Sequence, residues 1–357
     1  MRRVLSGLAI SCHFLLAAAL TADAASAEPH LTLGVNRTML SAQTPAVQEK
    51  TLSDIQALGA EWFRDGPTSG SPRGVANFVE ELARAKQHKL KVLVIIMAMD
   101  EDYDGALQTN RCGWKEKRLS QINLDKYATR LGTLFGAIKT AGLTVDAVEF
   151  GSEFDQYCYD ADVPRGRAGA ASPDEVETWL NGYGRFLQTG LRVVRDPKNF
   201  PDAKIITFGM AHSGDYRADE AFPDPARYVA MLRNVDGVDD LKDVDGYGTH
   251  LYPSPNDIGN SVRHTLGEDA AALGHDKPIW ITEWGFLEIR AFPNRSGQTL
   301  SRCLQTFLHV LDTLHASLKI GPAMFYRYDV WLTDPAGNLL PQAKALSAYA
   351  ASANGAK

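Results

Sequence analysis

The chain has 357 residues, of which 45% are hydrophobic and 22% are charged, and its formal net charge at pH 7 is −6. This acidic balance, with no basic cluster that contains interleaved aromatic residues, argues against a nucleic-acid partner. The length would allow two domains, but α/β barrels reach this size as one domain.

The first 27 residues have the features of a secretory signal peptide. Arg2 and Arg3 supply positive charge, residues 14–20 form an apolar segment, and the sequence A-S-A at 25–27 is a small-residue cleavage site. A lipoprotein modified at Cys12 is a less favoured alternative. We therefore expect an exported protein, periplasmic or secreted. Its mature domain would cover residues 28–357, which contain no apolar stretch long enough to span a bilayer.

Short β-rich runs alternate with longer helical patterns along the rest of the chain. The expected strands are, in order, residues 31–36, 61–65, 91–99, 145–152, 204–210, 244–251, 278–283 and 321–328. Helical patterns cover residues 45–58, 74–88, 124–141, 173–194, 225–234, 260–273, 299–318 and 342–351. Such alternation indicates a parallel sheet, and eight repeats favour a closed barrel over an open sheet. The predicted fold class is therefore α/β, with a single (β/α)8 TIM barrel.

Polar and aromatic residues gather where these strands end. In a barrel of this kind the active site lies at the carboxyl ends of the strands, so these side chains would converge on one mouth. In chain order the residues expected there are Arg64 after the second strand, Ser152 and Glu153 after the fourth, His212 after the fifth, His250 and Tyr252 after the sixth, Glu283 and Trp284 after the seventh, and Tyr326 and Trp331 after the eighth.

The two glutamates suit the cleavage of a glycosidic bond. That reaction needs a proton for the leaving oxygen and stabilisation of positive charge at the anomeric carbon, so one carboxyl must stay protonated and the other ionised. Arg64 and the Tyr252 hydroxyl would hold Glu283 as a carboxylate by charge pairing and hydrogen bonding. We therefore predict Glu283 as the nucleophile and Glu153 as the acid/base of a retaining glycosidase.

The other rim residues are predicted to bind a carbohydrate substrate. The rings of Trp284 and Trp331 would each offer a flat face to the apolar C–H face of a sugar. The remaining polar residues of this predicted substrate site are Ser152, His212, His250 and Tyr326, together with Arg64 and Tyr252.

Four short motifs resemble those of the clan A glycoside hydrolases, which are retaining barrels. V-E-F-G-S-E-F-D at 148–155 is similar to their acid/base motif, and I-T-E-W-G-F at 281–286 is similar to their nucleophile motif. W-F-R at 62–64 and H-L-Y at 250–252 fit the arginine and tyrosine that hold the nucleophile. The resemblance implies a β-linked poly- or oligosaccharide substrate, with Glu149 as a supporting acid and no metal or other cofactor.

The chain departs from that pattern at Ser152. Most of the clan has asparagine immediately before the acid/base, where its amide binds the sugar 2-hydroxyl, and a serine hydroxyl is shorter. Two alternatives to hydrolysis stay open, of which Ser152 favours the first. One is an exported carbohydrate-binding barrel without catalysis, and the other is a transglycosylase that uses the same residues with a sugar as acceptor.

The cysteines show no metal-binding spacing, since there is no C-x-x-C and no H-E-x-x-H. Cys112 and Cys158 fall in the loops after the third and fourth strands, which would be neighbours on one barrel face. We predict a disulfide between them. The alternative is that all three cysteines of the mature chain are unpaired thiols. Cys303 lies on a helical pattern and is predicted to belong to the core. Neither the sugar, the linkage nor the oligomeric state follows from the sequence.

Overall fold

The structure is a computed structural model that describes residues 30–163, 171–212, 224–253, 256–286 and 297–355. The predicted signal peptide lies outside these residues. Within them, no helix combines the length and the apolar character that crossing a membrane requires.

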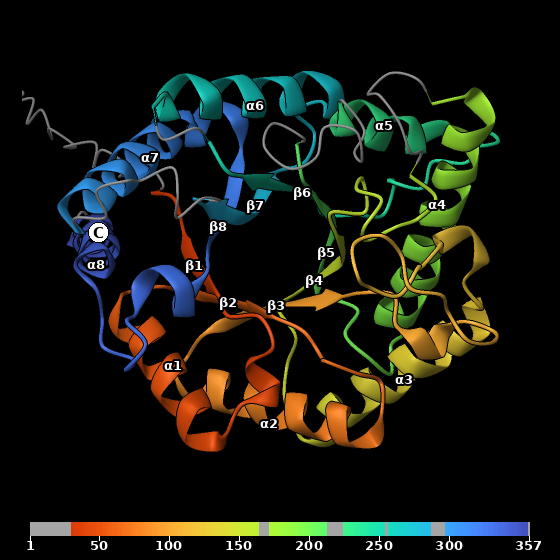
Figure 1. Ribbon diagram of the computed structural model, residues 1–357, viewed down its shortest axis with the longest axis horizontal. Coiled ribbons are helices and arrows are strands. Elements are labelled where there is room, and N and C mark those ends of the chain that lie inside the picture. The colour runs from red at the N-terminus through yellow and green to blue at the C-terminus, as the bar shows by residue number, and fades with distance from the viewer. Residues whose placement is uncertain (1–29, 164–170, 213–223, 254–255, 287–296, 356–357) are drawn as a thin grey trace, which may run out of the picture.

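Eight parallel strands close into one barrel, in the order of the sequence (Figure 1). The barrel closes where the first and last strands pair, with Leu33 opposite Ala323. The predicted (β/α)8 barrel is therefore confirmed. The strands are β1 (Leu33–Asn36), β2 (Trp62–Asp65), β3 (Lys91–Ile96), β4 (Ala147–Ser152), β5 (Lys204–Met210), β6 (Gly246–Leu251), β7 (Ile279–Gly285) and β8 (Ile320–Tyr326).

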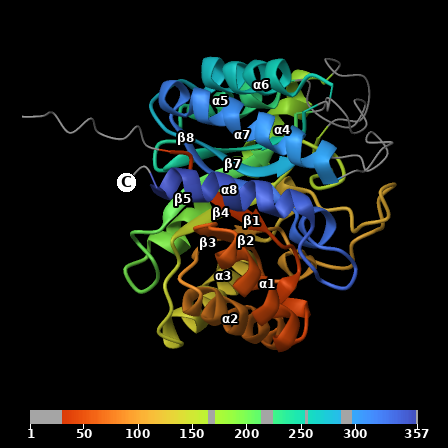
Figure 2. The ribbon, with the colours of Figure 1, turned by 90° about the vertical axis from the view of Figure 1, so that its left-hand side faces the viewer.

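The described part of the chain forms eight α-helices. They surround the barrel in both perpendicular views (Figures 1 and 2). Several begin with a hydroxyl cap followed by proline: Ser172 accepts a hydrogen bond from the backbone of Glu175 and precedes Pro173. The helices are α1 (Pro45–Ala57), α2 (Pro72–Gln87), α3 (Leu124–Thr140), α4 (Pro173–Arg195), α5 (Pro225–Met231), α6 (Ile258–Leu273), α7 (Gly297–Leu318) and α8 (Pro341–Gly355).

Three predicted elements end two or more residues earlier than expected. The strand predicted over 91–99 stops at Ile96. The helix predicted over 225–234 stops at Met231 and continues as the 3₁₀ turn Leu232–Asn234. The strand predicted to reach residue 328 stops at Tyr326, because the chain then forms a single wide helical turn over Tyr328–Leu332.

The barrel has two apolar regions. A large outer core lies between the sheet and the helices, and a small inner cluster fills the barrel itself. The inner cluster consists of Trp62, Leu93, Ala147, Ile206, Trp280 and Met324.

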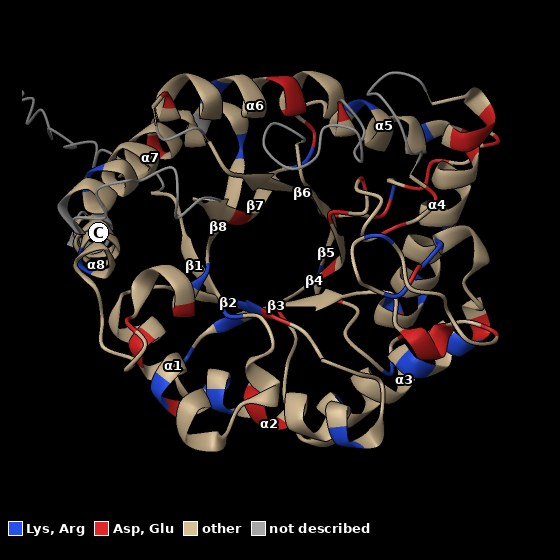
Figure 3. Cartoon of the chain, viewed as in Figure 1, with Lys and Arg blue, Asp and Glu red and all other residues tan. Residues whose placement is uncertain are grey.

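Alternation along the strands explains how the interior changes from apolar to polar. Residues two apart point to the same face of a strand. Arg64 therefore follows Trp62 into the barrel, and Glu149 follows Ala147. Most other charged positions lie on the outer helices and loops (Figure 3). Charge inside the barrel is thus concentrated near the carboxyl ends of the strands.

Candidate active site

Glu283, near the end of β7, is bound through both carboxylate oxygens. Arg64 Nη1 donates to Glu283 Oε1 over 2.7 Å, and the Tyr252 hydroxyl donates to Glu283 Oε2 over 2.5 Å. The side chain is only 9% exposed. Two donors from β2 and from the end of β6 therefore fix the carboxylate at the barrel mouth.

Arg64 is itself anchored deep in the barrel. Its Nε donates to Glu149 Oε2 over 2.6 Å, and its Nη1 also donates to Asn36 Oδ1 over 2.9 Å. Both Arg64 and Glu149 are essentially inaccessible to solvent. Glu149 thus has a defined task in this structure, which is to orient the guanidinium that holds Glu283.

Glu153 follows β4 in a left-handed conformation, with φ of +53°. Its backbone N–H donates to the carbonyl of Gly209 on β5 over 2.9 Å, which fastens the strained residue. Gly151 just before it has φ of +107°, and a Cβ there would lie 2.4 Å from the ring of Phe154. The end of β4 is therefore shaped by glycine so that the Glu153 side chain turns into the mouth.

The Glu153 carboxyl receives a hydrogen bond from its own loop. Gln156 Nε2 donates to Glu153 Oε2 over 3.0 Å. Tyr159 of the same loop lies nearby, and burial together with the Glu153 carboxyl raises the pKa of its hydroxyl. Neither Gln156 nor Tyr159 was expected from the sequence. Their position within six residues of Glu153, in the loop that contains Cys158, is the sequence feature that could have identified them.

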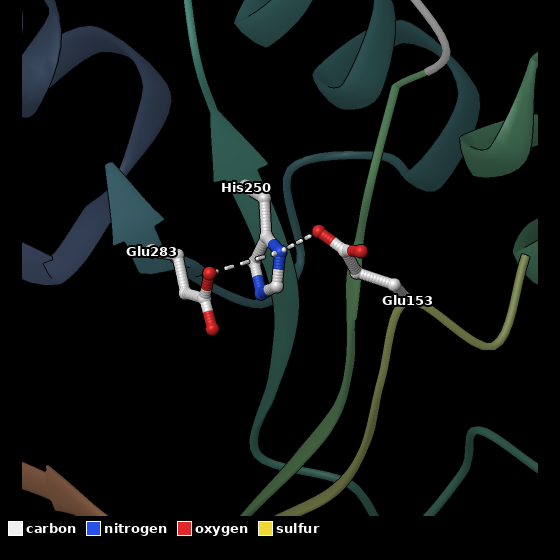
Figure 4. Close-up of side chains that lie close together, drawn as sticks. All are labelled: Glu153, His250 and Glu283. Atoms are coloured by element: carbon white, nitrogen blue, oxygen red, sulfur yellow. Dashed lines mark hydrogen bonds and ion pairs between the residues drawn. The ribbon is translucent and has the colours of Figure 1, made fainter. Parts of the chain in front are cut away.

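His250 lies between the two acids (Figure 4). Its Nδ1 is 2.9 Å from Glu153 Oε1 and 3.7 Å from Glu283 Oε2. One carboxylate oxygen of each glutamate and a ring nitrogen of His250 all lie within 4.8 Å of one another. Residues 130 positions apart in the chain thus meet at one point.

Charge and burial set the protonation states of Glu283 and Tyr252. Burial by itself raises the pKa of Glu283, but the charges of His250 and Arg64 and the hydrogen bonds from Tyr252 and Arg64 outweigh it, so the pKa is lowered. Burial and the neighbouring Glu283 carboxylate hold the pKa of Tyr252 well above its usual range. Glu283 is therefore ionised near neutral pH, and Tyr252 remains a donor.

His250 titrates under opposing influences. Burial lowers the pKa of its imidazole, whereas the charge of Glu283 and the hydrogen bond and charge of Glu153 raise it, and the net pKa is raised. A protonated ring donates from Nδ1 to Glu153 Oε1, and its positive charge lies 3.7 Å from Glu283 Oε2. When both glutamates are ionised, as after proton transfer from Glu153, the cationic ring reduces the repulsion between them.

Three further predicted residues have distinct surroundings. Tyr326 lies at the mouth with its ring edge-on to Tyr252, at a centroid distance of 6.1 Å. Ser152 is buried at the end of β4, opposite Gly209 of β5. His212 Nε2 bonds Thr249 Oγ1 over 2.9 Å and Asp269 over 3.1 Å, which directs this ring toward α6.

The two predicted tryptophan platforms were wrong. Trp284 is completely buried and stacks on Phe307 of α7, with ring centroids 4.6 Å apart. Because Glu283 points into the barrel, its neighbour in the strand must point outward to the helices. Trp331 is 6% exposed and packs edge-on against Phe286, so it offers no open face either.

A disulfide joins Cys112 in the loop after β3 to Cys158 in the loop after β4. Their Cα atoms are 5.8 Å apart, within the normal range for such a bond. Cys303 is a free thiol on α7. The disulfide ties together two loops beside Glu153.

Among the described residues, Glu153, His250 and Glu283 form one group whose geometry could hold a metal ion. Their ligand atoms already have protein partners: both oxygens of Glu283 accept from Arg64 and Tyr252, and Glu153 is hydrogen-bonded to Gln156 and His250. An ion would have to displace these donors beside a fixed guanidinium cation. The donor set therefore fits acid/base chemistry better than metal binding, and the prediction of no metal stays a prediction.

No protein-family model matches the chain, and no curated protein matches it in sequence. Solved structures do match over most of its length. One is the GH5_18 protein from Streptomyces cattleya in complex with GlcNAc, with a TM-score of 0.62, 13% identity, and coverage of 91% of this chain and 80% of that one. A GH5-4 broad specificity endoglucanase from an uncultured bacterium has a TM-score of 0.61 and 13% identity, with coverage of 91% and 94%.

The endo-β-1,4-mannanase from Thermotoga petrophila is also similar, with a TM-score of 0.56 and 14% identity over 92% of this chain and 77% of that one. At such identities the likeness concerns the fold. The chain therefore has the barrel fold of these glycosidases, and its activity must be argued from its own site.

Proposed function

We propose that the protein is a retaining glycoside hydrolase, with Glu283 as nucleophile and Glu153 as acid/base. The supporting observation is the approach of their carboxylate oxygens to within 4.8 Å at the mouth of the barrel. Retaining glycosidases hold their two carboxyl groups about 5–5.5 Å apart, whereas inverting enzymes need about 6.5–9.5 Å to admit a water molecule. This close approach favours the shorter, retaining spacing, in which Glu283 attacks the sugar directly.

In the first step the Glu283 carboxylate attacks the anomeric carbon while the bond to the leaving oxygen breaks. Glu153 gives its proton to that oxygen, so the leaving sugar departs as a neutral alcohol. Arg64 and Tyr252 keep Glu283 ionised and oriented before the attack. The product of this step is a glycosyl ester of Glu283.

In the second step Glu153, now a carboxylate, takes a proton from water as the water oxygen attacks the anomeric carbon. The ester bond to Glu283 breaks and both glutamates return to their starting states. Two inversions give net retention of anomeric configuration. A sugar hydroxyl in place of water would give transglycosylation by the same residues.

The proposed substrate is a β-linked poly- or oligosaccharide. The names of the structural neighbours support this choice, since they include an endo-β-1,4-mannanase and a β-xylosidase. We also propose that the protein acts outside the cytoplasm. The Cys112–Cys158 disulfide supports that location, because such bonds persist in oxidising compartments.

Two variants and one product analysis test the assignment. Glu283→Gln should abolish turnover of chromogenic β-glycosides, and Glu153→Ala should be rescued in part by azide with an activated leaving group. Proton NMR of the first products should show the β-anomer. Glu80→Gln, the same change at an exposed acid of α2, serves as control.

Retained turnover in Glu283→Gln, or inverted products, would remove the proposed mechanism. Binding of oligosaccharides without any product after long incubation would instead support a carbohydrate-binding barrel.

A further inference from the structure

The loop between β3 and α3 contains a small hairpin, residues 109–115, that exposes a tryptophan. Thr109 and Lys115 form its antiparallel bridge. Asn110 is buried inside, and its Oδ1 accepts from the backbone N–H of Cys112 over 2.9 Å and of Trp114 over 3.1 Å. One buried amide side chain thus holds the turn in a single shape.

The hairpin is fastened to the loop after β4 at several points. The Cys112–Cys158 disulfide links them covalently, and Asn110 Nδ2 donates to the Cys158 carbonyl over 3.3 Å. The Arg111 guanidinium lies 5.3 Å from the centre of the Tyr157 ring. The two loops therefore form one rigid unit, although they come from different β/α repeats.

Tyr159 connects this unit to the reaction centre. Its ring meets Trp114 at a centroid distance of 4.9 Å with planes at 61°. Burial and the nearby Glu153 carboxyl raise the pKa of its hydroxyl. A single side chain therefore separates the Trp114 ring from the proposed acid/base.

The exposure of Trp114 sets it apart from every other tryptophan of the chain. Its exposed fraction is 48%, whereas the other five are each 7% exposed or less. About half of this indole is left in water although the hairpin that carries it is held in one shape and packs on Tyr159. Exposed aromatic side chains near a reaction centre are typical contact points for a ligand. The ring face suits the apolar C–H face of a pyranose.

Resting on the proposed function, we propose that the disulfide-linked hairpin 109–115 and residues 154–163 of the loop after β4 form a sugar-binding subsite beside Glu153. Trp114 stacks on one pyranose ring of a β-linked oligosaccharide. Tyr159 is a positioning residue that supports Trp114 with its ring and holds the Glu153 carboxyl with its hydroxyl. The subsite replaces the platforms that the buried Trp284 and Trp331 do not supply.

Binding is measured first in a Glu283→Gln background, by calorimetric titration with cellotetraose, mannotetraose and xylotetraose. For any tetrasaccharide that the parent binds, Trp114→Ala should weaken binding roughly tenfold, and Trp114→Phe should weaken it less, because a ring face remains. Leu339→Ala, which truncates an exposed side chain outside the site, serves as control and should bind like the parent. Equal affinity of Trp114→Ala and the parent, or no binding by the parent to any of the three, overturns the proposal.

Tyr159→Phe tests the second half by comparing leaving groups. An unactivated leaving group needs the proton of Glu153, whereas dinitrophenolate departs without it. Tyr159→Phe should therefore lower kcat/KM, which reports the first step, about tenfold for an oligosaccharide and less than about twofold for the dinitrophenyl glycoside. An equal loss on both substrates would indicate a general structural role and overturn the positioning role.

The outcomes for the subsite and for the proposed function can be separated. Trp114-dependent binding without product from the wild-type protein would keep the subsite and reject the hydrolase. Hydrolysis that proceeds with unchanged KM in Trp114→Ala would keep the hydrolase and reject the subsite.

Discussion

Arg64 offers a sharp test of how the site holds its nucleophile, through the near-isosteric change Arg64→Met. The guanidinium donates to Glu149, Asn36 and Glu283 over 2.6–2.9 Å and is only 1% exposed. Its removal leaves two buried carboxylates without their shared cation. Breaking a buried ion pair by removing one partner costs about 3–5 kcal/mol.

We therefore expect the free energy of unfolding to fall by about 3–5 kcal/mol, which a domain of ordinary stability can survive. Activity should change in a second, separable way. Without Arg64 the pKa of Glu283 loses one of the charges that lower it, so the acid limb of the pH profile should move to higher pH.

A double variant separates the two effects. Arg64→Met with Glu149→Gln removes one of the two stranded charges, so part of the lost stability should return, by about 1–3 kcal/mol. Activity should not return, because Glu283 still lacks its partner. Urea unfolding at pH 7 measures the stability, and kcat/KM on a chromogenic β-glycoside from pH 3 to 8 measures the activity.

Two results would contradict this role of Arg64. One is an unchanged acid limb in Arg64→Met, which would mean that the guanidinium does not control the ionisation of Glu283. The other is recovery of activity in the double variant, which would make Glu149 the important partner. If Arg64→Met does not fold, Arg64→Lys retains one charge without the planar fork and should show the same shifts with smaller size.

Three further outcomes are expected. Tyr252→Phe removes a donor to the proposed nucleophile, so kcat/KM should fall roughly ten- to hundredfold with unchanged far-UV circular dichroism; an activity within twofold of wild type would contradict this. Replacing Cys112 and Cys158 by serine should lower the free energy of unfolding by about 2–4 kcal/mol and should also lower kcat/KM, whereas unchanged stability would show that the disulfide is dispensable. Burial raises the pKa of Asp65 to about 7, and burial together with the nearby charge of Asp65 raises the pKa of Glu81, so both hold protons that the unfolded chain releases above about pH 4. Wild-type stability should therefore fall between pH 5 and 8, and Glu81→Gln should reduce that fall by about 1–3 kcal/mol in urea titrations; equal slopes would reject the shared burial.

The amino-acid pattern alone predicts the barrel and the placement of its principal acids. Strand and helix periods alternate eight times, and Glu153, Glu283, Arg64 and Tyr252 all fall where apolar strands end. Because a closed parallel barrel brings all strand ends to one face, these positions sufficed to predict their convergence. Alternation in β7 also predicts that Trp284 points outward, since its neighbour Glu283 points into the barrel.

The contacts that depend on strand register and on the packing of loops are known only from the folded structure. The pairing of β6 with β7 shifts between Thr249 and His250, and this irregularity sets His250 opposite Glu283. Likewise Trp114 and Tyr159 meet because two loops of different repeats are tied together beside the mouth. Local sequence patterns encode the direction of a side chain within its own element. They do not encode a strand register or the approach of two loops, which are set by packing between distant parts of the chain.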